Sequence, residues 1–189
     1  MLRPRFFCAN AFSRTGYTFA SPFAIAAGDM TKYFGAGAKV RQLESTSVAG
    51  TVLTLNFTDA SAIVAGKPYL VKPAANVDFC ADGKEFAGVD LTTASATPTA
   101  TTYVNFVPTL GKTEVAGNVQ NILFLGADNE LLNPSSEGQY IKGFRAYFQL
   151  PEASPARAFV LDLGDGEKTG IQTLRTTGQP QHRQGRRNQ

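Results

Sequence analysis

Apolar runs of strand length, separated at short intervals by turn residues, dominate the pattern of residues 118–163. Residues 119–125 are mostly apolar and end at a glycine, and residues 140–150 alternate between two sets of side chains. A last run, residues 157–163, ends at a Gly-Asp-Gly turn. Because the side chains of a β-strand point alternately to its two faces, this pattern predicts strands that form the framework of a β domain.

The first part of the chain has a pattern of the same kind. Aromatic side chains recur at alternate positions within residues 16–25, which predicts a first strand. Residues 39–43 and 48–57 predict a hairpin, with its turn either at residues 45–47 or at residues 49–50. No window of a dozen residues has helical spacing with a cap at its start, so we expect little helix.

Two segments of the chain, residues 62–72 and 140–150, resemble each other. Each contains isoleucine, then glycine, a basic residue, a small or imino residue, and tyrosine followed by a large apolar residue, with one residue of slippage. A duplication of one β unit explains this likeness. Two unrelated strands that use the same amphipathic pattern explain it equally well, so both interpretations stay open.

These patterns predict an all-β fold, an antiparallel β-sandwich of two related halves, with a barrel-like arrangement as the alternative. A run of Thr, Ala, Ser and Pro is too small and polar to bury much surface, and it predicts a loop or linker. The expected organisation is an irregular segment at 1–15, a first β half at 16–91, the linker at 92–102, a second β half at 103–171 and a disordered basic tail at 172–189.

The composition is that of a globular protein with a sizeable core. Of 189 residues, 43% are hydrophobic and 14 are phenylalanine. A chain of this length removes roughly 70% of its unfolded surface from water when it folds, so its core does not depend on metals or disulfides. Cys8 and Cys80 have no CxxC partner, which excludes a cysteine zinc site or a thioredoxin motif. Whether the two cysteines pair with each other stays open.

The net charge of +3 belongs to the two ends of the chain. Five basic residues and no acidic residue lie from Lys168 onward, and three basic residues precede Thr15. Residues 15–167 therefore contain ten basic against fifteen acidic residues. A nucleic-acid surface needs lysine and arginine gathered on one folded face, so we expect no nucleic-acid partner.

The sequence also predicts how the chain relates to membranes. Its start is basic, but polar residues interrupt the apolar stretch that a signal peptide requires, so we expect no signal peptide in this chain. No apolar run approaches the ~20 residues that a membrane-spanning helix needs, and we expect the chain not to span a membrane.

Few residues are candidates for chemistry. The single histidine, His182, lies in the polar tail, where no packed surroundings hold it beside a nucleophile. Asp162, Asp165 and Glu167 flank two glycines, and such oxygen-rich turns can hold Ca²⁺. Their spacing is not that of an EF-hand, and a plain Asp-Gly turn is the favoured interpretation. We therefore predict no catalytic set, no cofactor and no enzyme activity.

Carbohydrate recognition would depend on tyrosine. Flat aromatic side chains are the usual platforms for sugar rings, and the chain has six tyrosines but no tryptophan. The alternating pattern assigns several of these tyrosines to a sheet face, where packing explains them without a ligand.

Four short segments of the sequence resemble segments of a known group of proteins. They are Ile-Val-Ala-Gly-Lys-Pro-Tyr-Leu-Val-Lys-Pro at 63–73, Asn-Ile-Leu-Phe-Leu-Gly at 121–126, Gly-Phe-Arg-Ala-Tyr-Phe at 143–148 and Asp-Gly-Glu-Lys-Thr-Gly-Ile at 165–171. In this order they resemble a recurring C-terminal β-rich module of Bacteroidetes-type secreted and surface proteins, often attached to leucine-rich or immunoglobulin-like repeats.

The resemblance implies a non-catalytic extracellular or cell-surface module, structural or adhesion-type, in a larger protein. A carbohydrate-binding accessory domain is the alternative, so the partner expected is an unidentified protein or glycan. Members of the group usually follow a signal peptide and upstream domains, and they continue beyond the Thr-Gly-Ile phrase with apolar and glycine residues. Residues 175–189 are polar and basic instead, so we expect this chain to be a fragment of a longer multidomain protein.

Overall fold

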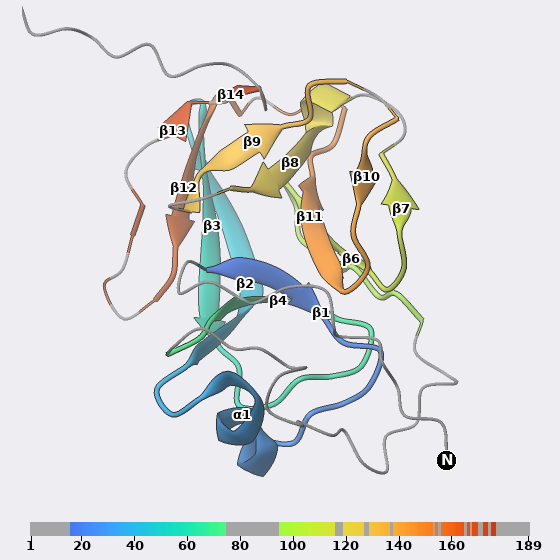
Figure 1. Cartoon of the computed structure of the whole chain (residues 1–189). Helices are drawn as coiled ribbons and strands as arrows, with labels where there is room; N and C mark the ends of the chain where they lie inside the picture. Colours follow the sequence, from blue (N-terminus) through green and yellow to red (C-terminus); the bar gives the residue numbers. More distant parts are fainter. Residues whose placement is uncertain are drawn as a thin grey trace, which may run out of the picture.

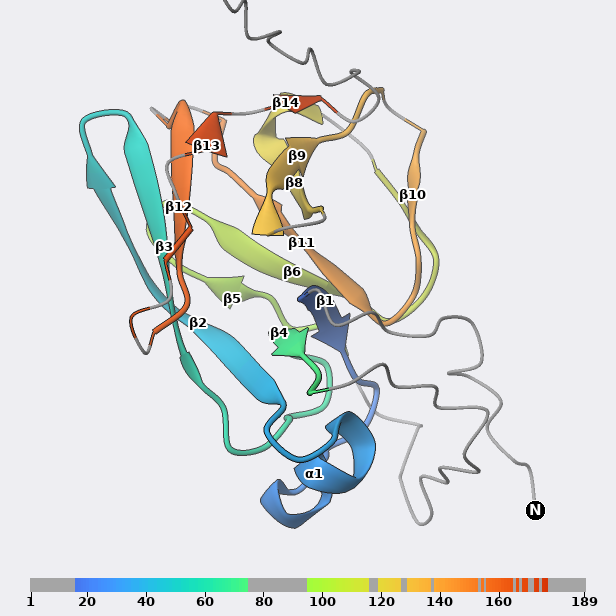
Figure 2. The ribbon, with the colours of Figure 1, turned by 60° about the vertical axis from the view of Figure 1, so that its left-hand side comes forward.

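The structure is a computed structural model of the chain. It describes residues 16–74 and 95–176, apart from short gaps at 116–118, 127–128, 137, 153, 155, 165, 167, 170–171 and 174. Within this part of the chain, two six-stranded sheets lie face to face, and one short helix lies beside the first sheet (Figures 1 and 2). The all-β fold with antiparallel sheets that the sequence predicted is confirmed, and two parallel pairings are added to it.

Each sheet combines strands from distant parts of the chain. The first sheet contains, in spatial order, β1 (Tyr17–Ala20), β4 (Pro68–Lys72), β2 (Lys39–Ala49), β3 (Val52–Asp59), β12 (Ala158–Asp162) and β13 (Gln172–Thr173). The second contains β5 (Thr99–Ala100), β6 (Asn105–Thr109), β11 (Arg145–Gln149), β8 (Ile122–Leu125), β9 (Leu131–Asn133) and β14 (Arg175–Thr176). β7 (Thr113–Glu114) and β10 (Tyr140–Ile141) form a separate pair beside the second sheet (Figure 1).

The two sheets repeat one strand order. The order β1-β4-β2-β3 in the first sheet matches β6-β11-β8-β9 in the second, and a parallel strand, β12 or β14, pairs with the last strand of each set. The other pairings described within these sheets are antiparallel. An isolated bridge between Ile25 and Ile63 occupies the place in the first half that the β7–β10 pair occupies in the second.

This correspondence extends to single residues. Ile141, Phe144 and Tyr147 follow Ile63, Gly66 and Tyr69 at one constant spacing of 78 residues. Both turns contain a residue in the left-handed region, Gly66 with φ of 77° and Phe144 with φ of 61°. The slippage inferred from the sequence is therefore not needed. The shared strand order and the shared turn support a duplication over coincidence.

The main core lies between the two sheets. It joins residues of both halves and of β12, and its buried aromatic centre is formed by Phe57, Phe106 and Phe148. The Phe106 and Phe148 rings stack with centroids 4.5 Å apart, and Phe57 meets both rings edge-on. Since β12 supplies Phe159 and Leu161 to this core, the C-terminal part of the chain completes the first sheet.

Two smaller clusters cover the outer faces of the sheets. On the first sheet, α1 (Ala27–Phe34) packs Tyr33 and Phe34 against residues that include Phe19 and Tyr69. The Phe19 and Phe34 rings meet edge-on at 5.6 Å. On the second sheet, Ile141 of β10 packs with buried residues at the start of β8 and beyond β7. The 3₁₀ helix η1 (Val119–Asn121) precedes β8.

The helix α1 is absent from the sequence prediction, which expected only little helix. It has eight residues, and the residue at its N-cap, Ala26, makes no side-chain hydrogen bond to the helix. The capping signal that predicts a helix start is therefore missing from the sequence. Burial of Tyr33 and Phe34 stabilises the helix instead, which is a tertiary effect.

The predicted hairpin forms between β2 and β3, and its turn is the second of the two alternatives. Gly50 has φ of 61°, a conformation that glycine adopts readily, and it lies directly after β2. Residues 45–47, the other candidate turn, belong to β2. The register between the two strands shifts between Leu43 and Ser45.

The single strand predicted for residues 140–150 is wrong, because β10 and β11 are separate strands. The chain turns at Gly143 and Phe144, and a Cβ atom on Gly143 would lie 3.2 Å from both the Gly111 Cα and the Leu110 carbonyl oxygen. This close approach of two backbones favours glycine. The predicted alternation holds within β11, where Ala146 and Phe148 are both buried.

Two predicted boundaries also differ from the structure. β5 lies inside the predicted linker at 92–102 and pairs with β6. β13 and β14 lie inside the predicted tail at 172–189, so the start of that segment pairs with both sheets. Residues 1–15 and 177–189, as well as Cys8, Cys80 and His182, lie outside the described residues. In the part of the chain that the structure describes, no helix has the length and apolar character needed to cross a bilayer.

Candidate functional site

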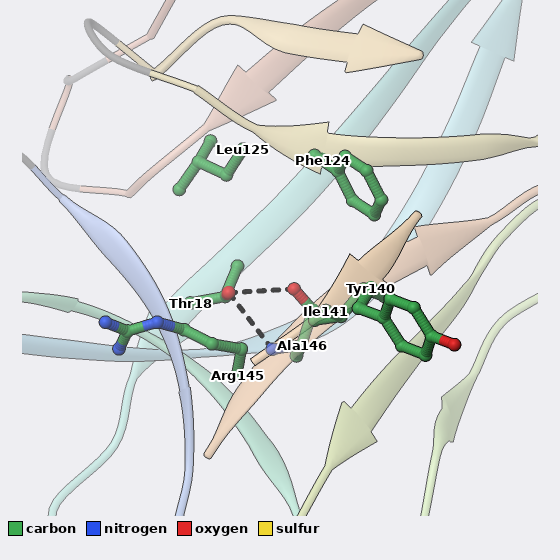
Figure 3. Close-up of a pocket in the computed structure, with 7 residues that line it drawn as sticks. All are labelled: Thr18, Phe124, Leu125, Tyr140, Ile141, Arg145 and Ala146. Atoms are coloured by element: carbon green, nitrogen blue, oxygen red, sulfur yellow. Dashed lines mark hydrogen bonds between the residues drawn. The ribbon is translucent and has the colours of Figure 1, made fainter. Parts of the chain in front are cut away.

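An open cleft of about 170 Å³ lies where the two halves meet at the second sheet (Figure 3). Its walls come from β1, β8, β10 and β11. We call it the Tyr140 cleft, and it is lined by Thr18, Phe124, Leu125, Tyr140, Ile141, Arg145 and Ala146. In Figure 3, Phe124 and Leu125 of β8 lie on one side of the cleft, and the other labelled residues lie on the opposite side.

Thr18 joins the halves at the floor of the cleft. Its hydroxyl donates a hydrogen bond to the Ala146 carbonyl at 2.7 Å and accepts one from the Ala146 amide at 3.0 Å. The side chain of Thr18 is thus a partner for both backbone groups of one residue of β11. With 6% of its surface exposed, Thr18 makes these bonds away from bulk water. The Ala20 amide adds a bond of 3.3 Å to the Phe144 carbonyl.

Arg145 borders the cleft at the start of β11. Its guanidinium lies over the Tyr17 ring, 5.4 Å from the ring centroid, which is a cation–π distance. Burial lowers the pKa of Arg145 below its usual value, although an arginine still stays charged at neutral pH. Burial also raises the pKa of Tyr17 above its usual value, so the phenol remains neutral. The pair keeps a fixed positive charge at this border.

Tyr140 forms the exposed end of the cleft. It is one of two large apolar side chains described as exposed, with 55% of its surface in solvent. The Lys112 ammonium lies 3.8 Å from the centroid of its ring. The Tyr140 hydroxyl donates a long hydrogen bond of 3.5 Å to a Glu114 carboxylate oxygen. The Tyr140 ring therefore has the Lys112 ammonium over its face and a Glu114 carboxylate oxygen at its hydroxyl.

The remaining wall is apolar. β8 ends with Phe124 and Leu125, and both side chains are half-buried. Consecutive residues of a strand point to opposite faces of the sheet. Leu125 therefore packs against the main core and Phe124 against the smaller cluster around Ile141. The cleft opens at the strand end where these two clusters approach each other.

The sequence placed its candidate metal site elsewhere, at Asp162, Asp165 and Glu167. The Asp162 carboxylate binds the Lys168 ammonium at 2.6 Å and accepts a hydrogen bond from the Gly164 amide at 3.2 Å. The bond from Lys168 lowers the pKa of Asp162 below its usual value. Asp162 thus has the role expected in a plain turn.

Asp165 and Glu167 lie outside the described residues, so the calcium hypothesis stays a prediction. Among the residues that the structure describes, no three or more His, Cys, Asp or Glu side chains come together in a way that could hold a metal ion.

The sequence identified Tyr140 only as one of six tyrosines. The other five are buried or half-buried. Nothing in the pattern indicated Thr18, because its partner is a backbone 128 residues away. Lys112 was equally hidden, since its position beside Tyr140 depends on the pairing of β7 with β10.

Comparisons of the chain with protein-family models, with curated proteins and with solved structures find no match. The geometry of the Tyr140 cleft is therefore the main support for a functional proposal.

Proposed function

We propose that this chain is a non-catalytic β module of an extracellular or cell-surface protein, with an adhesion-type or structural role. The observation that carries the proposal is the Tyr140 cleft, an open concavity lined mainly by aromatic and apolar side chains. Such surfaces recognise ligands through shape and apolar contact. The hydroxyl at its floor, that of Thr18, already bonds to the Ala146 backbone, which favours recognition over bond-making chemistry.

The geometry around Thr18 suits this role. Its hydroxyl uses both its donor and its acceptor capacity on the Ala146 backbone, so it is poorly placed to act as a nucleophile. Glu114 accepts a bond from Tyr140 and lies on the open surface.

The proposed setting is a longer protein. The resemblance to Bacteroidetes-type surface modules supports this setting, and an unidentified protein or glycan is the proposed partner. An antibody against the chain tests this setting in the organism that makes the protein. We expect the antibody to detect a protein longer than 189 residues, and its band should disappear when intact cells are treated with protease. A band of the chain's own size that survives this treatment would contradict the setting.

Adhesion is tested with beads that carry the purified chain. The beads are applied to immobilised matrix proteins, mucin and fixed epithelial cells, with albumin-coated beads as the control. We expect saturable retention on at least one surface, competition by the soluble chain, and no cleavage of the bound material. Retention no greater than that of albumin beads, or turnover of a surface component, would contradict the proposal.

A carbohydrate-binding accessory domain is the second candidate. The exposed Tyr140 ring favours it, because aromatic rings are common platforms for the apolar faces of sugars.

A further inference from the structure

The Tyr140 cleft combines two kinds of chemistry at one place. Phe124, Leu125 and Ile141 supply apolar surface, and the ring of Tyr140 adds an exposed aromatic platform. The Lys112 ammonium lies over one face of that ring, 3.8 Å from its centroid, and a Glu114 carboxylate oxygen lies 3.5 Å from its hydroxyl. A matching ligand therefore needs apolar faces together with groups that both donate and accept hydrogen bonds.

Arg145 adds a further donor at another part of the rim. In Figure 3 its guanidinium and the Tyr140 hydroxyl point to opposite sides of the cleft. Its contact with Tyr17 holds the guanidinium beside the cleft rather than in open solvent. The charged groups thus lie at the borders, and the apolar groups lie between them.

The size of the cleft limits its occupant. A cavity of about 150 Å³ accommodates one six-membered ring such as benzene. The volume of about 170 Å³ therefore matches one ring of that size, with its substituents directed to the open side. A large cofactor does not fit, because sites for drug-sized ligands start at roughly 300 Å³.

The two halves differ at this site although their strand order is the same. The residues that correspond to Tyr140 and Arg145 in the first half are Ala62 and Lys67, at the same spacing of 78 residues. The first half has a small, half-buried side chain where the second half has an exposed aromatic ring. The platform is thus a feature of the second half alone, and packing common to both halves does not account for it.

We infer that the Tyr140 cleft binds one sugar ring of a neutral oligosaccharide. This inference rests on the proposed recognition function and names its ligand class. The CH face of a pyranose packs on Phe124 and on the face of the Tyr140 ring opposite Lys112. Its hydroxyls meet Lys112, Glu114 and Arg145. A neutral hydroxyl-rich ligand suits a rim that carries charges of both signs, because hydroxyl groups both donate and accept hydrogen bonds.

The test is binding of the full chain to an array of neutral gluco-, manno-, xylo- and galacto-oligosaccharides. Uronic-acid oligomers and an acidic peptide serve as the competing ligand classes. We expect binding to neutral members, and titration calorimetry with the best of these should give affinities about tenfold weaker for Tyr140→Ala. Lys112→Ala should weaken the same interaction.

Matched control variants come from the first half. Val64→Ala removes the other large apolar side chain that is exposed among the described residues, with 52% of its surface in solvent. Lys32→Ala removes a lysine that lies 5.1 Å from the centroid of a tyrosine ring, that of Tyr33. Both controls should bind the oligosaccharide as the unchanged chain does. Circular dichroism of each variant verifies that the sheets are intact.

Three results would overturn the inference. They are no binding to any neutral oligosaccharide, binding that Tyr140→Ala and Lys112→Ala leave unchanged, and preference for the acidic peptide or the uronic-acid oligomers. If beads carrying the chain still adhere to a surface in any of these cases, the proposed adhesion function stands and only its ligand class is wrong.

Discussion

Thr18 shows how a single residue links the two halves. Most contacts between the sheets are apolar, whereas Thr18 bonds to the backbone of β11 through both capacities of its hydroxyl. Since the residue is buried, the loss of the hydroxyl leaves the amide and the carbonyl of Ala146 without these bonds. A buried polar group without a partner is costly, so Thr18 stabilises the fold more than its small side chain suggests.

Thr18→Val keeps the shape of the side chain and removes the hydroxyl. We expect it to lower the free energy of unfolding by about 1–3 kcal/mol, which urea denaturation measures. Thr18→Ser keeps the hydroxyl and is the control, with a smaller loss. Equal stability of the valine variant and the unchanged chain would show that the two bonds contribute nothing.

Asp162 gives a pH-dependent prediction. The Lys168 bond lowers its pKa in the folded state, so its stabilising contribution is present above the unfolded pKa, near 3.8, and is lost as the pH falls through the folded pKa. An NMR titration should therefore give an Asp162 midpoint below 3.8, and Lys168→Ala should raise it. A midpoint that does not respond to Lys168→Ala would contradict the assigned cause.

At the scale of the elements, the sequence predicted some turns and strands correctly and missed others. The β2–β3 hairpin followed from its apolar pattern, which is a local signal, whereas the sequence leaves its turn open between two candidates and the structure places Gly50 directly after β2. The split between β10 and β11 did not, since Phe144 adopts a left-handed conformation that its sequence does not indicate. The helix α1 was missed for the same kind of reason, because the packing that stabilises it comes from other elements.

The turn at Gly66 depends on a distant segment. Its amide donates to the Ser21 carbonyl at 2.7 Å, and its carbonyl accepts a bond from the Thr97 amide at 2.9 Å. A Cβ atom at this position would lie only 2.0 Å from the Ser95 carbonyl oxygen. No side chain fits there without movement of the backbone.

Substitutions at two glycines test this contact. Gly37→Ala should cost about 1–2 kcal/mol, because Gly37 has φ of 83° but open space around it. Gly66→Ala should cost clearly more, since the same conformational strain is joined by the clash with Ser95. Denaturant midpoints of the two variants provide the comparison. Similar midpoints would mean that residues 95–97 do not hold the turn.

The whole molecule contains two similar halves whose sheets share one core. The fold class and the likeness of the halves could be predicted from the sequence, because both depend on alternation along the chain. The exchange of strands between halves could not be predicted. β12 lies in the predicted second half and yet pairs with β3 of the first, and such a parallel pairing leaves no local signal.

This exchange predicts cooperative unfolding. The main core draws residues from both sheets, and Phe159 and Leu161 of β12 belong to it. Calorimetry of the full chain should therefore record one transition, with calorimetric and van't Hoff enthalpies that agree. Residues 16–102 alone should remain unfolded by circular dichroism. Two separate transitions would show that the halves are independent domains.

The Tyr140 cleft could not be predicted from the sequence, because it forms where strands from both halves meet. Its residues span positions 18 to 146, and their approach depends on the pairing of β11 with β6 and β8 and on the contact of Thr18 with Ala146. Recognition at this cleft is the central claim about function.

An NMR titration of the full chain with the neutral oligosaccharide that binds best on the array tests this claim most directly. We predict that the largest chemical-shift changes occur at Thr18, Lys112, Phe124, Tyr140 and Arg145. The corresponding region of the first half, around Ala62 and Lys67, should remain unchanged. Shift changes centred outside the cleft, or equal changes in both halves, would contradict the account.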